Sequence, residues 1–253
     1  YSEKTAVAFA AIAKLANCGP QPGVLGAVSA TCAPVAAPGA SGVCDQAGLS
    51  LRPGTVAVGL PADASASASF VSARVDAKDG ADFKSGVLLA FNAKTAEREG
   101  KLAHNGLTEC GGCAVREDYL QAMKAILPQV RAALELNMCQ AADKECAVHF
   151  AGHGPGAAVA QLVAWELMRE HYEVGASYIF GAPVLGNAQV AVSMKDYFDG
   201  KIFGPIIQVA GDEGGKGESK GDEATGDACK SALAPGGDFC EPKADQCFGG
   251  LPL

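Results

Sequence analysis

The pattern of apolar and polar residues predicts a chain in which helices and strands alternate. Near the N-terminus, apolar residues recur at close to helical spacing and stop at a Cys-Gly-Pro turn, which predicts a helix over residues 1–15. A longer helical pattern covers residues 115–137, with Pro128 as an expected kink. Further helices are expected at residues 155–170 and 188–197, and strands at residues 55–60, 70–75, 86–91, 147–151, 176–180 and 205–210. Such alternation predicts an α/β fold, a mostly parallel central sheet with helices on both faces.

Two segments lack this periodicity. Residues 19–48 are rich in Pro, Gly, Ala and Ser, which predicts an irregular loop. Residues 212–247 carry nine acidic and four basic side chains among many glycines, which favours a solvated stretch followed by a cysteine-containing tail. A chain of 253 residues is long enough for one large domain. We therefore expect a single domain over residues 1–253, with a core at 1–211 and an acidic, Gly-rich tail at 212–253.

Charge and cysteine content narrow the function classes. The net charge is −8 and no block of Lys or Arg stands out, which disfavours binding to nucleic acid or to anionic lipid surfaces. The longest apolar run, residues 6–13, falls short of the roughly 20 residues that a transmembrane helix needs. Ten cysteines, an even number, suit disulfides in an oxidising compartment. We expect a secreted protein or one in the lumen of an oxidising organelle, and the lack of a start Met fits a mature chain.

The turn between the strand at 147–151 and the next helix carries the most informative motif. Residues 152–156 read GHGPG, which resembles the G-H-S-L-G nucleophile elbow of class 3 lipases with Gly154 in place of the serine. Residues 180–187 read FGAPVLGN and resemble the F-G-x-P-R-V-G-N signature that follows the next strand in that family. Residues 88–94 and the CGGC at 110–113 are similar to segments of the fungal secreted lipases. The resemblance extends to about Asp212 and implies an α/β-hydrolase fold.

The departures from the family pattern fall on the catalytic residues. The resemblance implies a triad in the order Ser, Asp, His. Gly154 has no side chain that could attack a carbonyl, and Pro155 has no N–H to donate to an oxyanion. Asp212 stands at the family's acid position, but all four histidines precede it. Lys94 ends the turn at the second oxyanion donor. These four positions are therefore interpreted as relics, and no functional catalytic residue is expected.

The cysteines are expected to be fully paired. The CGGC segment could be a redox or zinc motif, but without a second CxxC we favour a structural disulfide. The fungal lipases have a bond from the N-terminal helix to the tail, and the resemblance implies the same bond here. The local pairs and those left by elimination complete the prediction: Cys18–Cys247, Cys32–Cys44, Cys110–Cys113, Cys139–Cys146 and Cys229–Cys240. No metal and no cofactor is expected.

The favoured function is that of a non-catalytic pseudo-lipase. It would serve as a structural or protein-interaction component of a secreted or lumenal assembly, and a lipid or acyl ligand is the other partner considered. The alternative is an active lipase or esterase with relocated catalytic residues, for instance Ser85, Ser177 or Ser193. If the site is no longer used, side chains including Lys94 and His153 should fill or screen the space above Gly154. The charged segment at residues 97–99 is expected to be a solvated loop in place of an apolar lid.

Overall fold

A computed structural model of the chain provides the fold. It describes residues 3–17, 32, 42–52, 55–60, 68–78, 81, 83–94, 101–104, 110–198 and 202–203. The strand predicted at 205–210, the tail at 212–253 and the charged segment at 97–99 lie outside the described residues.

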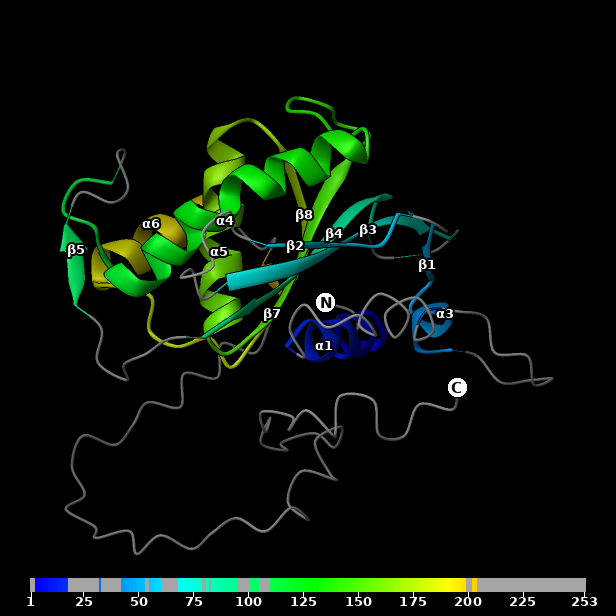
Figure 1. The fold of residues 1–253 in the computed structure, drawn as a ribbon, viewed down its shortest axis with the longest axis horizontal. Coiled ribbons are helices and arrows are strands. Elements are labelled where there is room, and N and C mark those ends of the chain that lie inside the picture. Colours follow the sequence, from blue (N-terminus) through cyan, green and yellow to red (C-terminus); the bar gives the residue numbers. More distant parts are fainter. Residues whose placement is uncertain are drawn as a thin grey trace, which may run out of the picture.

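A mixed β-sheet forms the centre of the molecule (Figure 1). Its strands are β1 (Leu49–Leu51), β2 (Ala57–Gly59), β3 (Ala68–Ala77), β4 (Gly86–Ala93), β7 (Ala147–His153), β8 (Glu173–Phe180) and β9 (Ile202–Phe203). They lie in the order β1-β3-β4-β7-β8-β9, and β2 also pairs with β3. Strands β4, β7, β8 and β9 are parallel, whereas β3 runs antiparallel to β1, β2 and β4. The parallel strands therefore end at one edge, where the elbow motif follows β7.

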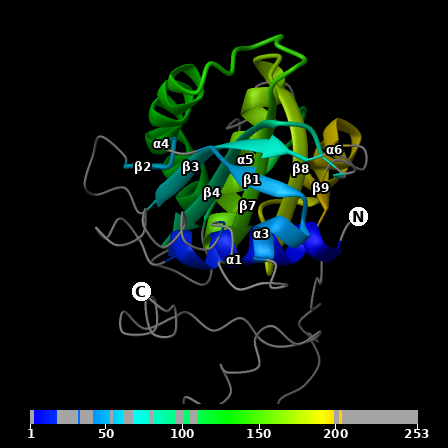
Figure 2. The same cartoon turned by 90° about the vertical axis from the view of Figure 1, so that its right-hand side faces the viewer.

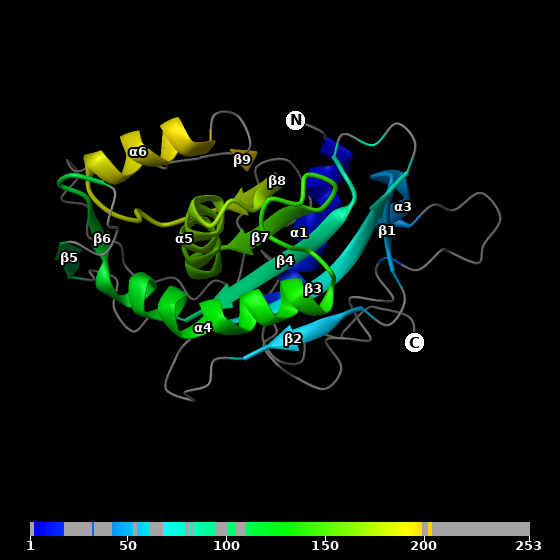
Figure 3. The same ribbon diagram turned by 90° about the horizontal axis from the view of Figure 1, so that it is seen from above.

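Helices cover both faces of this sheet. Helix α1 (Glu3–Asn17) lies against one face, and α4 (Glu117–Leu136), α5 (Pro155–Arg169) and α6 (Ala188–Phe198) pack on the other, as Figures 2 and 3 show. The side chains of β4 alternate, so that Leu88 faces α1 and Leu89 faces α5. The predicted α/β architecture is thus confirmed. Among the described residues, no helix combines the length and apolar content that crossing a membrane requires.

Several short elements differ from the sequence prediction. Helix α3 (Val43–Gln46) occupies the end of the segment predicted as an irregular loop, and strand β1 follows directly after it, where no element was predicted. Strands β5 (Leu102–His104) and β6 (Ala114–Arg116) form a separate two-stranded sheet, so the long helix begins at Glu117 and continues through Pro128. Elements of three or four residues contain too few positions to show a period, and this is why the pattern missed them.

Three disulfides are present in the described part of the chain. They are Cys32–Cys44, Cys110–Cys113 and Cys139–Cys146, three of the five predicted pairs. Cys18, Cys229, Cys240 and Cys247 lie outside the described residues, so the two pairs that involve them stay predictions.

Candidate functional site

The elbow motif forms a sharp strand-to-helix turn at the carboxyl end of β7. Gly154 connects the last residue of β7 to the first residue of α5 and has φ +54° and ψ −129°. This part of conformational space is strained for residues with a Cβ atom. The Gly154 N–H donates to the Phe180 carbonyl at 2.9 Å, and its own carbonyl accepts from Ala157 N at 3.0 Å. Hydrogen bonds to β8 and to α5 therefore hold the turn on both sides.

Two further glycines allow this turn to lie close to the sheet. A Cβ atom on Gly156 would stand 2.4 Å from the Phe91 carbonyl oxygen at the end of β4. A Cβ atom on Gly152 would stand 2.8 Å from Ala157 Cα. Neither distance is tolerable between non-bonded atoms, so α5 can begin here only with glycine at both positions. The backbone of the G-x-x-x-G elbow is intact.

Within the described part of the chain, the space directly above Gly154 is open. Apart from the two chain neighbours, no heavy atom of the described residues lies within 4 Å of the position that a Cβ atom on Gly154 would take. Lys94, predicted to help fill this space, is exposed at the end of β4 and does not reach that distance. The His153 ring lies toward Gly181, where its Nε2 would be 3.5 Å from an added Cβ. The expectation that side chains fill or screen the space above Gly154 stays a prediction, because it also concerns segments outside the described residues.

The elbow lacks two chemical groups that acyl transfer requires. Gly154 offers no nucleophilic atom, and Pro155 is the first residue of α5 and has no N–H. In this fold the amide after the nucleophile is one of two oxyanion donors, so one of them is missing. The second donor region, residues 92–94, ends β4 beside Gly156. Asp212, at the family's acid position, lies outside the described residues.

His149 has a structural role that the sequence did not reveal. The pairing of β7 with β8 shifts by one residue between Val148 and Phe150, which marks a β-bulge. Within it, the buried His149 ring accepts at Nδ1 from Ala176 N at 3.0 Å and donates from Nε2 to the Lys84 carbonyl at 2.8 Å. Burial lowers the pKa of His149 to about 4. This histidine is a neutral packing residue that completes the bulge, and it lies in the cluster facing α1.

The other candidate side chains are dispersed. His171 is exposed at the far end of α5, and the side chain of His104 lies outside the described residues. Ser85 accepts a hydrogen bond from Ala77 N at 2.9 Å and precedes β4, at the edge of the sheet opposite the elbow. Ser177 is buried inside β8, and Ser193 lies on α6. None of the three serines is at the elbow.

The FGAPVLGN motif has a clear structural role. Asn187 donates from Nδ2 to the Gly112 carbonyl at 2.8 Å, and its Oδ1 accepts from Ala114 N at 3.1 Å. The same Oδ1 accepts from Val190 N at 3.3 Å in the first turn of α6, which is an N-cap arrangement. One side chain therefore attaches α6 to β6 and to the loop closed by Cys110–Cys113.

Comparison with known proteins assigns this architecture to a family. Residues 83–207 match the family model described as lipase (class 3). Similar solved structures include a mutant form of MDLA from Penicillium cyclopium, with 20% identity and a TM-score of 0.50 over 81% of this chain and 71% of that chain. Lipase II from Rhizopus niveus has 14% identity and a TM-score of 0.54 over 76% of this chain and 67% of that chain.

M37 lipase has 11% identity and a TM-score of 0.55 over 81% of this chain and 67% of that chain. No curated protein matches the sequence. At such identities the structural likeness shows the fold, which is that of an α/β-hydrolase. Through residues 83–207, the chain belongs to the class 3 lipase family.

Proposed function

We propose that this chain is a catalytically inactive member of the lipase family. It serves as a structural or protein-interaction component of a secreted or lumenal assembly. The observation that carries the proposal is Gly154, because the elbow turn is retained while the atom that would attack an ester is missing. The lipase fold points to a lipid-related origin, and the three disulfides of the described region suit an oxidising compartment.

The expected losses in catalytic rate are large enough to support inactivity. Removal of the nucleophile from a serine hydrolase lowers kcat by about 10⁶. Removal of one oxyanion donor, as Pro155 does here, costs about 10²–10³ in rate. The two losses are not additive. A serine hydrolase without its nucleophile keeps about 10³–10⁴-fold over the uncatalysed rate through its oxyanion hole and substrate binding. The missing N–H of Pro155 takes away part of that remainder.

The retained scaffold supports a binding role. Gly152 and Gly156 keep α5 against the sheet, and Asn187 keeps α6 attached to β6, although no ester chemistry depends on them here. Function is carried by sites placed on a fold, and a fold that is retained without the nucleophile supports a role for a site other than the elbow.

The direct test is turnover of p-nitrophenyl butyrate and of emulsified triacylglycerol. We expect no rate above buffer for the purified chain, with an active fungal class 3 lipase as the positive control. Gly154→Ser should stay inactive, because Pro155 still lacks the N–H, and Gly154→Ser/Pro155→Leu tests the oxyanion donor separately. Turnover by the unaltered chain that survives repurification would overturn the proposal.

A fluorophosphonate probe distinguishes an inactive chain from an active hydrolase with relocated catalytic residues. This reagent forms a covalent bond with an activated serine wherever it lies in the chain. We expect no labelling of the unaltered chain by mass spectrometry. Labelling of Ser85, Ser177 or Ser193 that is lost in the matching serine-to-alanine variant would favour an active hydrolase.

A second candidate function is binding of an acyl ligand without hydrolysis. The space above Gly154 favours it, since no side chain of the described residues lies within 4 Å of an added Cβ there. Titration with a fluorescent fatty acid tests this role. Saturable binding at one site, displaced by unlabelled fatty acid, would support the acyl-binding role, and its absence would leave the protein-interaction role alone.

A further inference from the structure

Helices α4 and α5 both end at a left-handed residue that is not glycine. Met138 follows α4 with φ +54°, and His171 follows α5 with φ +66°. After α4, Met138 N donates to Glu135 O and Cys139 N to Leu134 O, both at 2.9 Å. After α5, the amides of His171 and of the next residue make the corresponding pair of bonds, both at 3.0 Å. This is the Schellman arrangement, in which glycine is the usual left-handed residue.

The two helix ends are joined to each other. Ala142, itself left-handed at φ +64°, donates from its amide to the His171 carbonyl at 2.8 Å. The disulfide Cys139–Cys146 closes the loop between the helix end and β7. An ion pair between Arg131 of α4 and Glu170 at the end of α5 connects the helices nearby. The loop after α4 and the end of α5 therefore form one surface.

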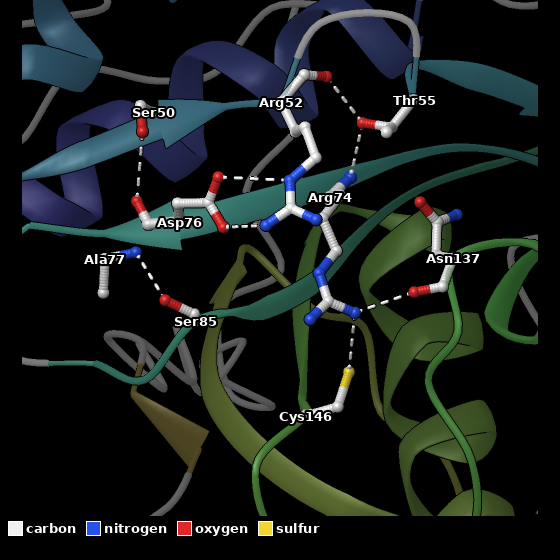
Figure 4. Close-up of polar contacts among 9 residues, drawn as sticks. All are labelled: Ser50, Arg52, Thr55, Arg74, Asp76, Ala77, Ser85, Asn137 and Cys146. Atoms are coloured by element: carbon white, nitrogen blue, oxygen red, sulfur yellow. Dashed lines mark hydrogen bonds and ion pairs between the residues drawn. The ribbon is translucent and has the colours of Figure 1, made fainter.

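A half-buried arginine holds this surface against the sheet. Arg74 of β3 donates from its guanidinium to the Asn137 carbonyl at 2.7 Å and contacts Cys146 Sγ at 3.5 Å (Figure 4). Asn137 in turn donates from Nδ2 to the Ala133 carbonyl at 2.8 Å. Because these contacts fix the last carbonyls of α4, the residues just beyond them are presented in a defined geometry.

Two apolar side chains project from this defined surface. Leu136 is 83% exposed and Met138 is 73% exposed, the two highest values among the large apolar residues of the described region. Glycine at position 138 would relieve the backbone strain, yet the chain has a long apolar side chain there. Strained residues of this kind cluster at ligand-binding and other functional sites, and the strain at Met138 points to such a site. We call Leu136, Met138, Ala142 and His171 the helix-end patch.

Acidic side chains outnumber basic ones in the chain segment that contributes most of the helix-end patch. Residues 135–145 contain Glu135, Asp143 and Glu145 against one base, Lys144, and all four are at least partly exposed. A second copy of the chain would bring the same acidic rim opposite, and like charges across an interface are unfavourable. The chain's own segment 212–247, with nine acidic and four basic residues, meets the same repulsion, as does an anionic membrane. A basic partner has the complementary charge.

We propose that the helix-end patch docks a basic, apolar segment of a partner protein. The apolar side chains of the segment cover Leu136 and Met138, and its Lys or Arg side chains lie over Glu135 and Glu145. This proposal rests on the proposed protein-interaction function and names the surface and the partner chemistry through which it acts.

The test uses short fluorescein-labelled peptides and the full chain with its disulfides intact. One peptide consists of leucine and lysine, and its twin has glutamate in place of every lysine. In fluorescence anisotropy we expect the lysine peptide to bind at least about tenfold more tightly than the glutamate peptide, and its affinity to fall as salt is raised. Equal affinity for the two peptides, or no binding of the lysine peptide, would overturn the proposal.

Single substitutions test whether the lysine peptide binds at the helix-end patch. Met138→Gly should weaken binding of the lysine peptide about tenfold, because the apolar side chain is lost, while it raises the Tm by removing strain. Leu136→Ser should weaken binding to a similar extent. Val192→Ser, which alters another exposed apolar side chain (62% exposed, on α6), is the matched control and should leave binding unchanged. Equal changes in peptide affinity for the three variants would show that the peptide does not bind specifically at the helix-end patch.

Two further measurements test whether a second copy of the chain or a membrane covers the helix-end patch instead. Sedimentation velocity that shows self-association abolished by Met138→Gly would identify a second copy of the chain as the occupant and overturn the proposal. Flotation with phosphatidylcholine vesicles that depends on Met138 would identify a membrane and overturn it as well. These outcomes are independent of the ester-turnover assay, so a failure of docking and a failure of the proposed inactivity can be told apart.

Discussion

The two ends of α5 use left-handed backbone in opposite ways. Before the helix, at the turn where the family has its catalytic serine, the chain has Gly154, which adopts φ +54° with little strain. After the helix it has His171 at φ +66°, and the neighbouring helix α4 ends at Met138 with φ +54°. Glycine would suit all three positions, but only the first has it.

This difference indicates where side chains matter in the molecule. At the elbow, a side chain that carries backbone strain is useful only if it performs chemistry, and its removal leaves a relaxed turn. At the helix ends, the strain is retained together with exposed apolar groups at Leu136 and Met138. The contrast favours a surface function at the helix ends over a chemical function at the elbow, and the following variants test each side of it.

The largest effect is expected from Gly156→Ala. The new methyl group would lie 2.4 Å from the Phe91 carbonyl, so α5 would have to move away from β4. We expect a loss of about 3 kcal/mol or more in the free energy of unfolding, measured by urea denaturation. Gly111→Ala, where an added Cβ meets nothing within 4 Å, is the control and should be near neutral. Similar values for the two variants would show that α5 does not begin so close to the sheet.

Acid should destabilise the strand that carries the elbow. His149 of β7 has a pKa lowered by burial to about 4 in the folded state, against 6.5 for the free side chain. The unfolded chain therefore binds the proton more readily, so this contribution to stability is complete above pH 6.5 and is lost as the pH falls toward 4 and below. The loss should approach about 3 kcal/mol.

Urea denaturation at a series of pH values measures this loss. His149→Leu should remove the dependence between pH 6.5 and 4, although it lowers stability at neutral pH because Ala176 N and the Lys84 carbonyl lose their partner. His171→Gln, at the helix-end patch, should retain the full acid dependence. If His171→Gln abolished the acid dependence instead, the helix ends and not the strand of the elbow would be the acid-sensitive region.

Gly154→Ala isolates the strain of the elbow from its packing. The methyl group meets no atom of the described residues within 4 Å, so the expected cost comes from φ +54° and ψ −129°. We expect a loss of about 1–3 kcal/mol in the free energy of unfolding, smaller than that of Gly156→Ala. A loss as large as that of Gly156→Ala would mean that the space above Gly154 is filled after all.

Glycine substitutions at the two helix ends should have the smallest effects and the opposite sign, and Met138→Gly the larger of the two. Relief of the left-handed strain should raise the free energy of unfolding by about 1 kcal/mol, partly offset by the greater freedom of glycine in the unfolded chain. His171→Gly should give a smaller gain, because histidine tolerates this conformation better than methionine does. A loss of stability in both variants would indicate that the side chains pack within the chain, which would weaken the contrast with the elbow.

The amino-acid sequence by itself determined the long elements and the chemistry missing from the elbow. Helices α1, α4 and α5 repeat their apolar period over several turns, and β7 followed by α5 is a strand–turn–helix unit with glycines in the turn. Gly154 and Pro155 exclude a nucleophile and an amide donor in any conformation, because the atoms are absent. No tertiary contact was needed for that inference.

Only the tertiary structure decided how these residues are used, because the deciding contacts join residues far apart in the chain. The turn at Gly154 depends on the Phe180 carbonyl, and His149 becomes neutral and structural only between Lys84 and Ala176. Whether side chains reach the space above Gly154 depends likewise on the packing of several elements, and in the described part of the chain none outside the turn lies within 4 Å of an added Cβ there. The junction of the two strained helix ends depends in the same way on the fold, which brings the loop after α4 against the end of α5.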